Sequence, residues 1–192
     1  MKIKPVIKKE LKLSRKALFI WIAVVVLTAA FSVAEFPMIA DNVEMVTQGI
    51  EMMPRIVQVM FGVEDVTLET PRGYFIVMFF WFSLIVYFHA AVTGVTIITR
   101  DERDKTSEFL YAKPYQRSSI LTAKMAAAMI NIAVMSVVTW LCSLGTLLIT
   151  TGLAPTQTQE GTLIPASALA ILGMLLSQSV FLSLGFLCAS FF

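Results

Sequence analysis

The sequence predicts an all-α integral membrane protein with four transmembrane helices, whose charges lie mainly in the N-terminal segment and in the loops that join the helices. Of its residues, 57% are hydrophobic and only 15% are charged, whereas a typical soluble domain is about 25% charged. Four long runs contain no Asp, Glu, Lys or Arg, and each reaches the roughly 20 residues that a helix needs to cross a membrane. Because lipid offers the backbone no hydrogen-bond partners, these runs are expected to be helices. We place the spans at about residues 17–34, 73–99, 120–152 and 164–192, within one domain covering residues 1–192.

The N-terminal segment is strongly basic. Before the first span, the only acid is Glu10, and the cations are Lys2, Lys4, Lys8, Lys9, Lys12, Arg15 and Lys16. Ile7, Leu11 and Leu18 recur at helical spacing after Pro5. These features favour a basic amphipathic helix on the anionic inner leaflet, with a disordered cationic tail as the alternative. No small-residue cleavage site follows the first span, so we expect that span to be retained.

The charges of the loops alternate along the chain. Residues 35–72 are mainly acidic, residues 100–124 carry six cations, and residues 153–164 contain no Lys or Arg. Lys and Arg concentrate in cytoplasmic loops. The pattern therefore predicts a multi-pass protein of the cell membrane, with its N-terminus and the 100–124 loop in the cytoplasm.

The acidic external loop has a helical pattern of its own. One predicted face is made of residues three or four apart, namely Val43, Val46, Ile50, Met53, Val57 and Met60. Pro54 is compatible with a kink or with the first turn of a second helix, and Gly62 is a plausible helix end. We expect one or two short helices that lie on the membrane surface or cap the spans.

The five methionines of this loop raise the question of metal binding. They are Met38, Met45, Met52, Met53 and Met60. Thioethers suit Cu(I), but no Cys or His accompanies them, and Met is also an adaptable apolar filler. We expect no metal site in the chain.

Two kinds of reactive side chain lie inside the spans. An ionisable group such as His89 within a membrane is a functional candidate by default. No acid lies near it in sequence, so we favour a neutral His89 that hydrogen-bonds a Ser or Thr of a neighbouring span. Cys142 and Cys188 lack partner motifs, and we expect them to be buried, small apolar residues without a disulfide or metal.

The last span contains two pairs of small residues that permit close helix contact. Gly173 is followed four residues later by Ser177, and Gly185 by Ala189. Such pairs are common in membrane helices. They suggest where neighbouring helices approach, without specifying which ones.

No motif for catalysis or nucleotide binding is present. The sequence has no phosphate-binding loop, no dinucleotide fingerprint, no H-E-x-x-H and no G-x-S-x-G. We therefore expect neither an enzyme nor a nucleic-acid-binding protein. The spans also lack the embedded acids of ion-coupled carriers, so a transporter of this kind needs energy from a separate subunit.

The cytoplasmic loop resembles a known family. Its residues are similar to the E-R-x-G-T-x-E-x-L-x-x-x-P-x-x-R pattern of ABC-2 type transporter permeases, with Lys105 where the family usually has Gly. The matching positions are Asp101, Glu102, Arg103, Thr106, Glu108, Leu110, Pro114, Arg117 and Lys124. Lys8-Lys9-Glu10-Leu11 and the segment from Met53 to Tyr74 also resemble this family.

The resemblance implies a permease, with ATP and Mg²⁺ bound by two separate cytoplasmic ATPase subunits and with a second permease copy beside it. It also implies six spans, so we expect this four-span sequence to be a fragment or a split half. In the family, the loop at 100–119 forms a coupling helix seated on the ATPase. Carried over to this sequence, the coupling residues are Glu102, Thr106, Glu108, Phe109, Leu110 and Tyr111.

We expect a permease subunit of an ATP-driven transporter, acting as an exporter. The alternative is a non-transporting membrane scaffold or sensor that docks a cytoplasmic partner through the 100–124 loop. The sequence does not indicate a substrate.

Overall fold

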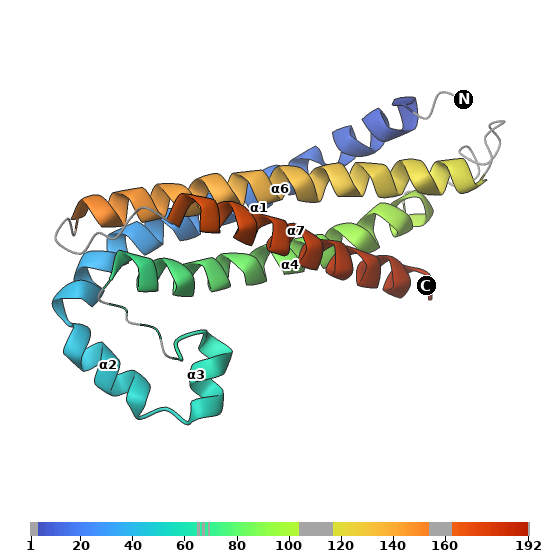
Figure 1. The fold of residues 1–192 in the computed structure, drawn as a ribbon. Coiled ribbons are helices and arrows are strands. Elements are labelled where there is room, and N and C mark those ends of the chain that lie inside the picture. Colours follow the sequence, from blue (N-terminus) through green and yellow to red (C-terminus); the bar gives the residue numbers. More distant parts are fainter. Residues whose placement is uncertain are drawn as a thin grey trace. The chain divides into compact units, whose positions relative to one another are not determined.

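A computed structural model describes residues 4–64, 66, 68, 70–103, 117–153 and 163–191 of the chain. Within these residues the only regular elements are helices (Figure 1). They are α1 (Lys4–Asp41), α2 (Val43–Glu51), α3 (Arg55–Phe61), α4 (Pro71–Arg103), α6 (Arg117–Leu153) and α7 (Leu163–Ala189).

Four of these helices are long and apolar enough to cross a membrane. They cover Lys4–Asp41, Pro71–Asp101, Ser118–Leu153 and Leu169–Ala189. This confirms the predicted all-α membrane fold with four spans.

Helix α1 is longer than the sequence pattern predicted. It has 38 residues, which corresponds to about 57 Å at 1.5 Å per residue. The basic N-terminal segment is helical, as expected, but it is continuous with the first span and is not a separate element. Between Pro5 and Pro37 no Gly or Pro interrupts the helix.

The segment predicted to be an external loop contains two short helices, α2 and α3, within the predicted one or two. Pro54 immediately precedes α3 as its N-cap, where its missing N–H costs nothing. Gly62 ends α3 with a φ of 69°, in the left-handed region that Gly adopts readily. Neither α2 nor α3 has a buried residue. The five methionines are all exposed, so they fill no core within this chain.

The described chain divides into two compact units. Unit 1 comprises Met1–Ile22, Val86–Val137 and Leu172–Phe192, and unit 2 comprises Ala23–Ile85 and Val138–Ile171. In unit 2, the Phe36 and Tyr74 rings lie 5.1 Å apart, and the Tyr74 hydroxyl donates to the Ser32 carbonyl at 2.7 Å. The buried phenol is thus satisfied inside the protein.

The core of unit 1 is built from small and branched apolar side chains. Its buried members are Ala90, Ile97, Ala127, Ala128, Ile132 and Leu182. The alanines let helix backbones come close, and close approach lets dispersion and hydrogen bonding hold helices together in a membrane. This core supports the polar groups described below.

A close helix approach in unit 1 joins Gly94 of α4 to Gly185 of α7. A Cβ atom added to Gly94 would lie 2.5 Å from the Leu182 carbonyl oxygen and 3.1 Å from the Gly185 Cα. A Cβ on Gly185 would collide with the Ala91 carbonyl oxygen. Of the two predicted small-residue pairs, the one containing Gly185 lies at a close contact. Gly173 has nothing within 4 Å of its added Cβ.

We expect Gly94→Ala to destabilise the protein, because the new methyl group meets backbone atoms that cannot move aside. The expected loss is about 1–3 kcal/mol, the usual cost of overpacking a well-packed site. Gly145→Ala is the matched control, because an added Cβ there meets nothing within 4 Å. Its better helix propensity should leave stability unchanged or raise it by up to about 1 kcal/mol. Thermal unfolding in detergent, followed by Trp fluorescence, measures both. Equal effects of the two variants would show that the Gly94–Gly185 contact is not tight.

Candidate functional site

The predicted coupling residues fall almost entirely outside the described part of the chain. Thr106, Glu108, Phe109, Leu110 and Tyr111 lie in the segment 104–116, which the structure does not describe. Glu102 lies in the last turn of α4, but its side chain is likewise outside the description. Their predicted role therefore stays a prediction. What the structure does describe is the base of this loop.

A buried ion pair joins the two helices that flank the loop. The Lys124 Nζ of α6 lies 2.6 Å from Oδ2 of Asp101 in α4, and both side chains are only 8% exposed. The same ammonium donates to the carbonyl oxygens of Ile97 at 2.9 Å and Ile98 at 3.4 Å. Lys124 therefore binds both a side chain and the backbone near the end of α4. This pairing connects the start of α6 to the end of α4.

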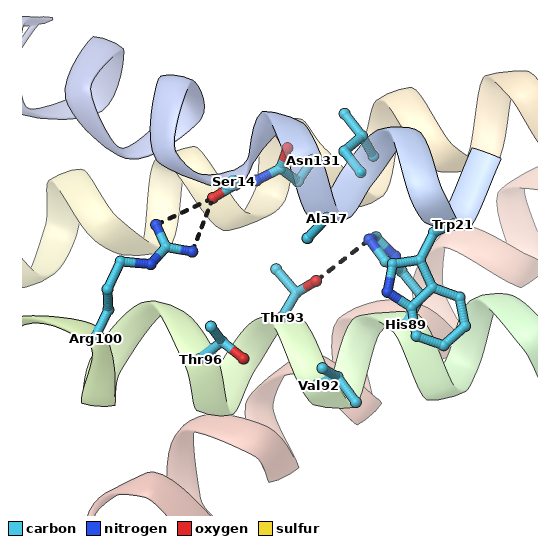
Figure 2. A pocket seen from close by; sticks show the side chains of 10 residues that line it. Ser14, Ala17, Trp21, His89, Val92, Thr93, Thr96, Arg100 and Asn131 are labelled. Atoms are coloured by element: carbon cyan, nitrogen blue, oxygen red, sulfur yellow. Dashed lines mark hydrogen bonds between the residues drawn. The ribbon is translucent and has the colours of Figure 1, made fainter. Parts of the chain in front are cut away.

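A second buried pair connects α1 to α4. The Arg100 guanidinium donates to Oε2 of Glu10 at 3.3 Å, and both side chains are buried. It also donates through two nitrogens to Ser14 Oγ, each at 3.4 Å (Figure 2). The Ser14 hydroxyl in turn donates to the Glu10 carbonyl at 2.9 Å. Ser14 therefore helps to hold Arg100 beside Glu10.

Lys9 completes the ion cluster, which we define as Lys9, Glu10, Arg100, Asp101 and Lys124. Its Nζ lies 3.5 Å from Asp101 Oδ1, and its side chain is 46% exposed. The two buried acids are thus matched by two buried cations, with Lys9 at the edge. Removing a charge from water costs several kcal/mol unless a partner and hydrogen bonds replace the solvent. The cluster therefore constrains α1, α4 and α6 to a common arrangement.

The sequence identified the charged residues of this cluster but not their pairing. Glu10 is the lone acid in a basic segment, and Asp101 and Lys124 flank the loop that was predicted to be cytoplasmic. Their contacts depend on which helical faces meet in the folded chain. Glu10 and Arg100 are 90 residues apart, so spacing along one helix could not show the contact.

A small cavity lined by both polar and apolar side chains lies next to the cluster in unit 1. Its volume is about 40 Å³. Its polar lining residues include Arg100, Ser14, Asn131, His89 and Thr93, and in Figure 2 the Asn131 amide lies beside Ser14 while His89 lies beside Thr93. The remaining lining residues are Ala17, Leu18, Trp21, Val92 and Thr96.

The partner of His89 differs from the prediction. Its Nε2 lies 3.3 Å from Thr93 Oγ1, and Thr93 belongs to the same helix, not to a neighbouring span. The contact across helices comes instead from Trp21 of α1, whose ring meets the imidazole edge at a centroid distance of 5.6 Å. A Thr four residues further along a helix lies on the same face. The four-residue spacing of His89 and Thr93 in the sequence therefore already indicated that these two side chains could meet.

The cysteines are both free, in agreement with the prediction. Their predicted burial is only partly correct, because Cys142 is half-buried and Cys188 is exposed on α7. A residue in an apolar span can face away from the rest of the chain, since lipid is as apolar as a protein core.

The chain belongs to the ABC-2 family of transporter proteins, whose family model matches residues 5–192. Membership places it among the membrane-embedded transporter permeases, which in general are not catalytic and work with an ATPase. No curated protein and no solved structure matches the chain.

We expect Lys124→Met to cost about 3–5 kcal/mol of stability, because it removes the buried ammonium that lies closest to the Asp101 carboxylate and leaves the half-exposed Lys9 at 3.5 Å. Arg55→Met is the matched control. Arg55 also forms a 2.6 Å ion pair, with Glu64, but its side chain is 86% exposed, so the expected cost is about 1 kcal/mol or less. Thermal unfolding in detergent measures both.

A second variant separates pairing from packing. If the charge of Asp101 causes the loss, adding Asp101→Asn to Lys124→Met should recover part of the stability. A double variant that is less stable than Lys124→Met alone would contradict this explanation.

Proposed function

We propose that this chain is a permease subunit of an ATP-driven exporter in the cell membrane, with its N-terminus in the cytoplasm. A separate ABC ATPase would bind ATP and Mg²⁺ and supply the energy, and a second permease copy would complete the pathway. Family membership supports the permease role. The observation that carries the proposed coupling is the buried Asp101–Lys124 ion pair, which lies at the base of the loop predicted to contact the ATPase.

The ion pair suits the transmission of movement. Asp101 and Lys124 are both buried, and their contact holds the two ends of the loop together. Separating them would take from each buried charge its closest charged partner, which is expected to cost several kcal/mol. A displacement of the loop by the ATPase would therefore move the ends of α4 and α6 together. Such rigid-body movement is a common way of switching between conformations.

The Arg100–Glu10 pair extends this movement to α1. Arg100 directly precedes Asp101 in α4, and its guanidinium is bonded to both Glu10 and Ser14 of α1. The three helices would then respond as one group at this end of unit 1. In this proposal the ion cluster relays movement and performs no chemistry.

The loop residues have a separate role in the proposal. Phe109, Leu110 and Tyr111 would form the apolar anchor on the ATPase, since aromatic and large apolar groups dominate binding energy at interfaces. Glu102, Thr106 and Glu108 would support the contact and set its register through polar and charged interactions. The cationic N-terminal segment and the cations of the 100–124 loop support the cytoplasmic placement.

A photo-crosslinking residue at Phe109 tests the proposed contact. In cells that also express a candidate ABC ATPase subunit, we expect it to form a covalent adduct with that subunit. The same residue at the exposed Met45 of the external helix α2 should give none, because the two loops face opposite sides of the membrane. Adducts would be identified by mass spectrometry. An adduct from Phe109 with a cytoplasmic protein that is not an ATPase would favour the scaffold or sensor function instead.

Two sets of substitutions should separate docking from coupling. Phe109→Ala with Leu110→Ala should weaken binding of the ATPase by roughly 10- to 100-fold, because it removes two apolar anchors. Asp101→Asn should leave binding within about threefold, since Asp101 is buried away from the surface, but it should lower the stimulation of ATP hydrolysis by the permease.

Both sets are measured with purified subunits in lipid nanodiscs. Met45→Ala with Met52→Ala provides the control, since both side chains are exposed in the external loop. Unchanged binding and unchanged ATP hydrolysis in the Phe109/Leu110 variant would show that this loop is not the coupling element.

A further inference from the structure

We propose that the cavity next to the ion cluster is a water-binding site, in which buried water hydrogen-bonds His89 and Asn131 inside the helix bundle of unit 1. The inference concerns the cavity alone and does not depend on the proposed ATPase partner.

The first reason is that two enclosed polar groups lack partners. His89 is 2% exposed and Asn131 is 3% exposed, and both line the cavity. Neither His89 Nδ1 nor Asn131 Nδ2 has a hydrogen-bond partner within the described part of the chain. Burying such a group without a partner costs about 1–3 kcal/mol, so two adjacent ones are expected to share a bound ligand.

The second reason is the match between the cavity and water. Its volume of about 40 Å³ exceeds the roughly 10–15 Å³ that one water needs on this scale. It therefore has room for two or three waters but not for an organic solute. A buried water also requires two to four polar partners. Besides His89 and Asn131, the cavity offers Ser14, Thr93, Thr96 and Arg100.

The third reason is that water fits either protonation pattern of the imidazole. The Nε2 of His89 already lies beside the Thr93 hydroxyl. If Nδ1 carries the proton it donates to water, and if it does not it accepts from water. An ammonium-like or carboxylate ligand would satisfy only one of these arrangements. The Asn131 Nδ2 needs an acceptor, and the water oxygen provides one.

The arrangement also indicates what the water would do. Ser14 and Trp21 bring α1 to the cavity, His89 and Thr93 belong to α4, and Asn131 belongs to α6 (Figure 2). Dry cavities in proteins are lined by apolar groups, whereas polar groups from all three helices meet here. Water would bridge His89 of α4 and Asn131 of α6, and it would extend the polar contacts of Arg100 and Ser14 toward His89.

His89 makes a selective probe because it is the only histidine in the sequence. The full chain, labelled with ¹⁵N-histidine and reconstituted in lipid bilayers, gives one imidazole spin system in solid-state NMR. We expect magnetisation to transfer from water protons to this imidazole. In Asn131→Leu, which removes a polar partner and fills space, the transfer should fall about twofold or more.

Gln178→Leu is the matched control. Gln178 is also a fully buried amide in unit 1, bonded through Nε2 to Ser136 Oγ at 2.8 Å, but it does not line the cavity. Transfer in this variant should equal that of the unaltered chain. Absence of transfer in the unaltered chain would overturn the proposal whatever the variants do. An equal loss in both variants would also overturn it, because the effect would then follow from general repacking and not from this cavity.

Discussion

Charges that are buried at the end of a helix bundle must find partners inside the protein, and this requirement organises unit 1. Asp101 and Lys124 satisfy each other, Arg100 and Glu10 do the same, and Ser14 links the second pair to the backbone. The alanines of the core and the Gly94–Gly185 contact allow the backbones to approach closely enough for this. Apolar packing and ion pairing therefore depend on each other. The short apolar side chains keep the helix backbones close together, and this short separation lets the charged side chains of neighbouring helices meet.

The features that follow from local chemistry were predictable from the sequence. Uncharged runs predicted the spans, because the membrane excludes charges along a whole helix. Pro54 and Gly62 predicted the limits of α3. Pro54 restricts its own φ angle, and Gly62 permits the positive φ angle at which the helix ends. The loop residues from Asp101 to Lys124 indicated the family to which the chain belongs.

Features that depend on helix faces meeting in space were not predictable in the same way. The partner of Glu10 is fixed by the register of α1 against α4, which no local pattern of the sequence shows. His89 is an intermediate case: its neighbour Thr93 is four residues away on the same helix, but the edge contact with Trp21 required the structure. The exposure of Cys188 has the same origin, because an apolar sequence does not show which side of a span faces lipid.

The Asp101–Lys124 ion pair joins the two ends of the loop between α4 and α6, and this position has an evolutionary consequence. Asp101 and Lys124 separate the segment that would meet a partner from the spans that are embedded in lipid. If these two charges are kept, the connection between α4 and α6 is preserved while the loop sequence between the two helices diverges. The loop is thus a module whose sequence can diverge faster than the helices that carry it. Exchange of this module between related permeases would be a simple route to a change of partner.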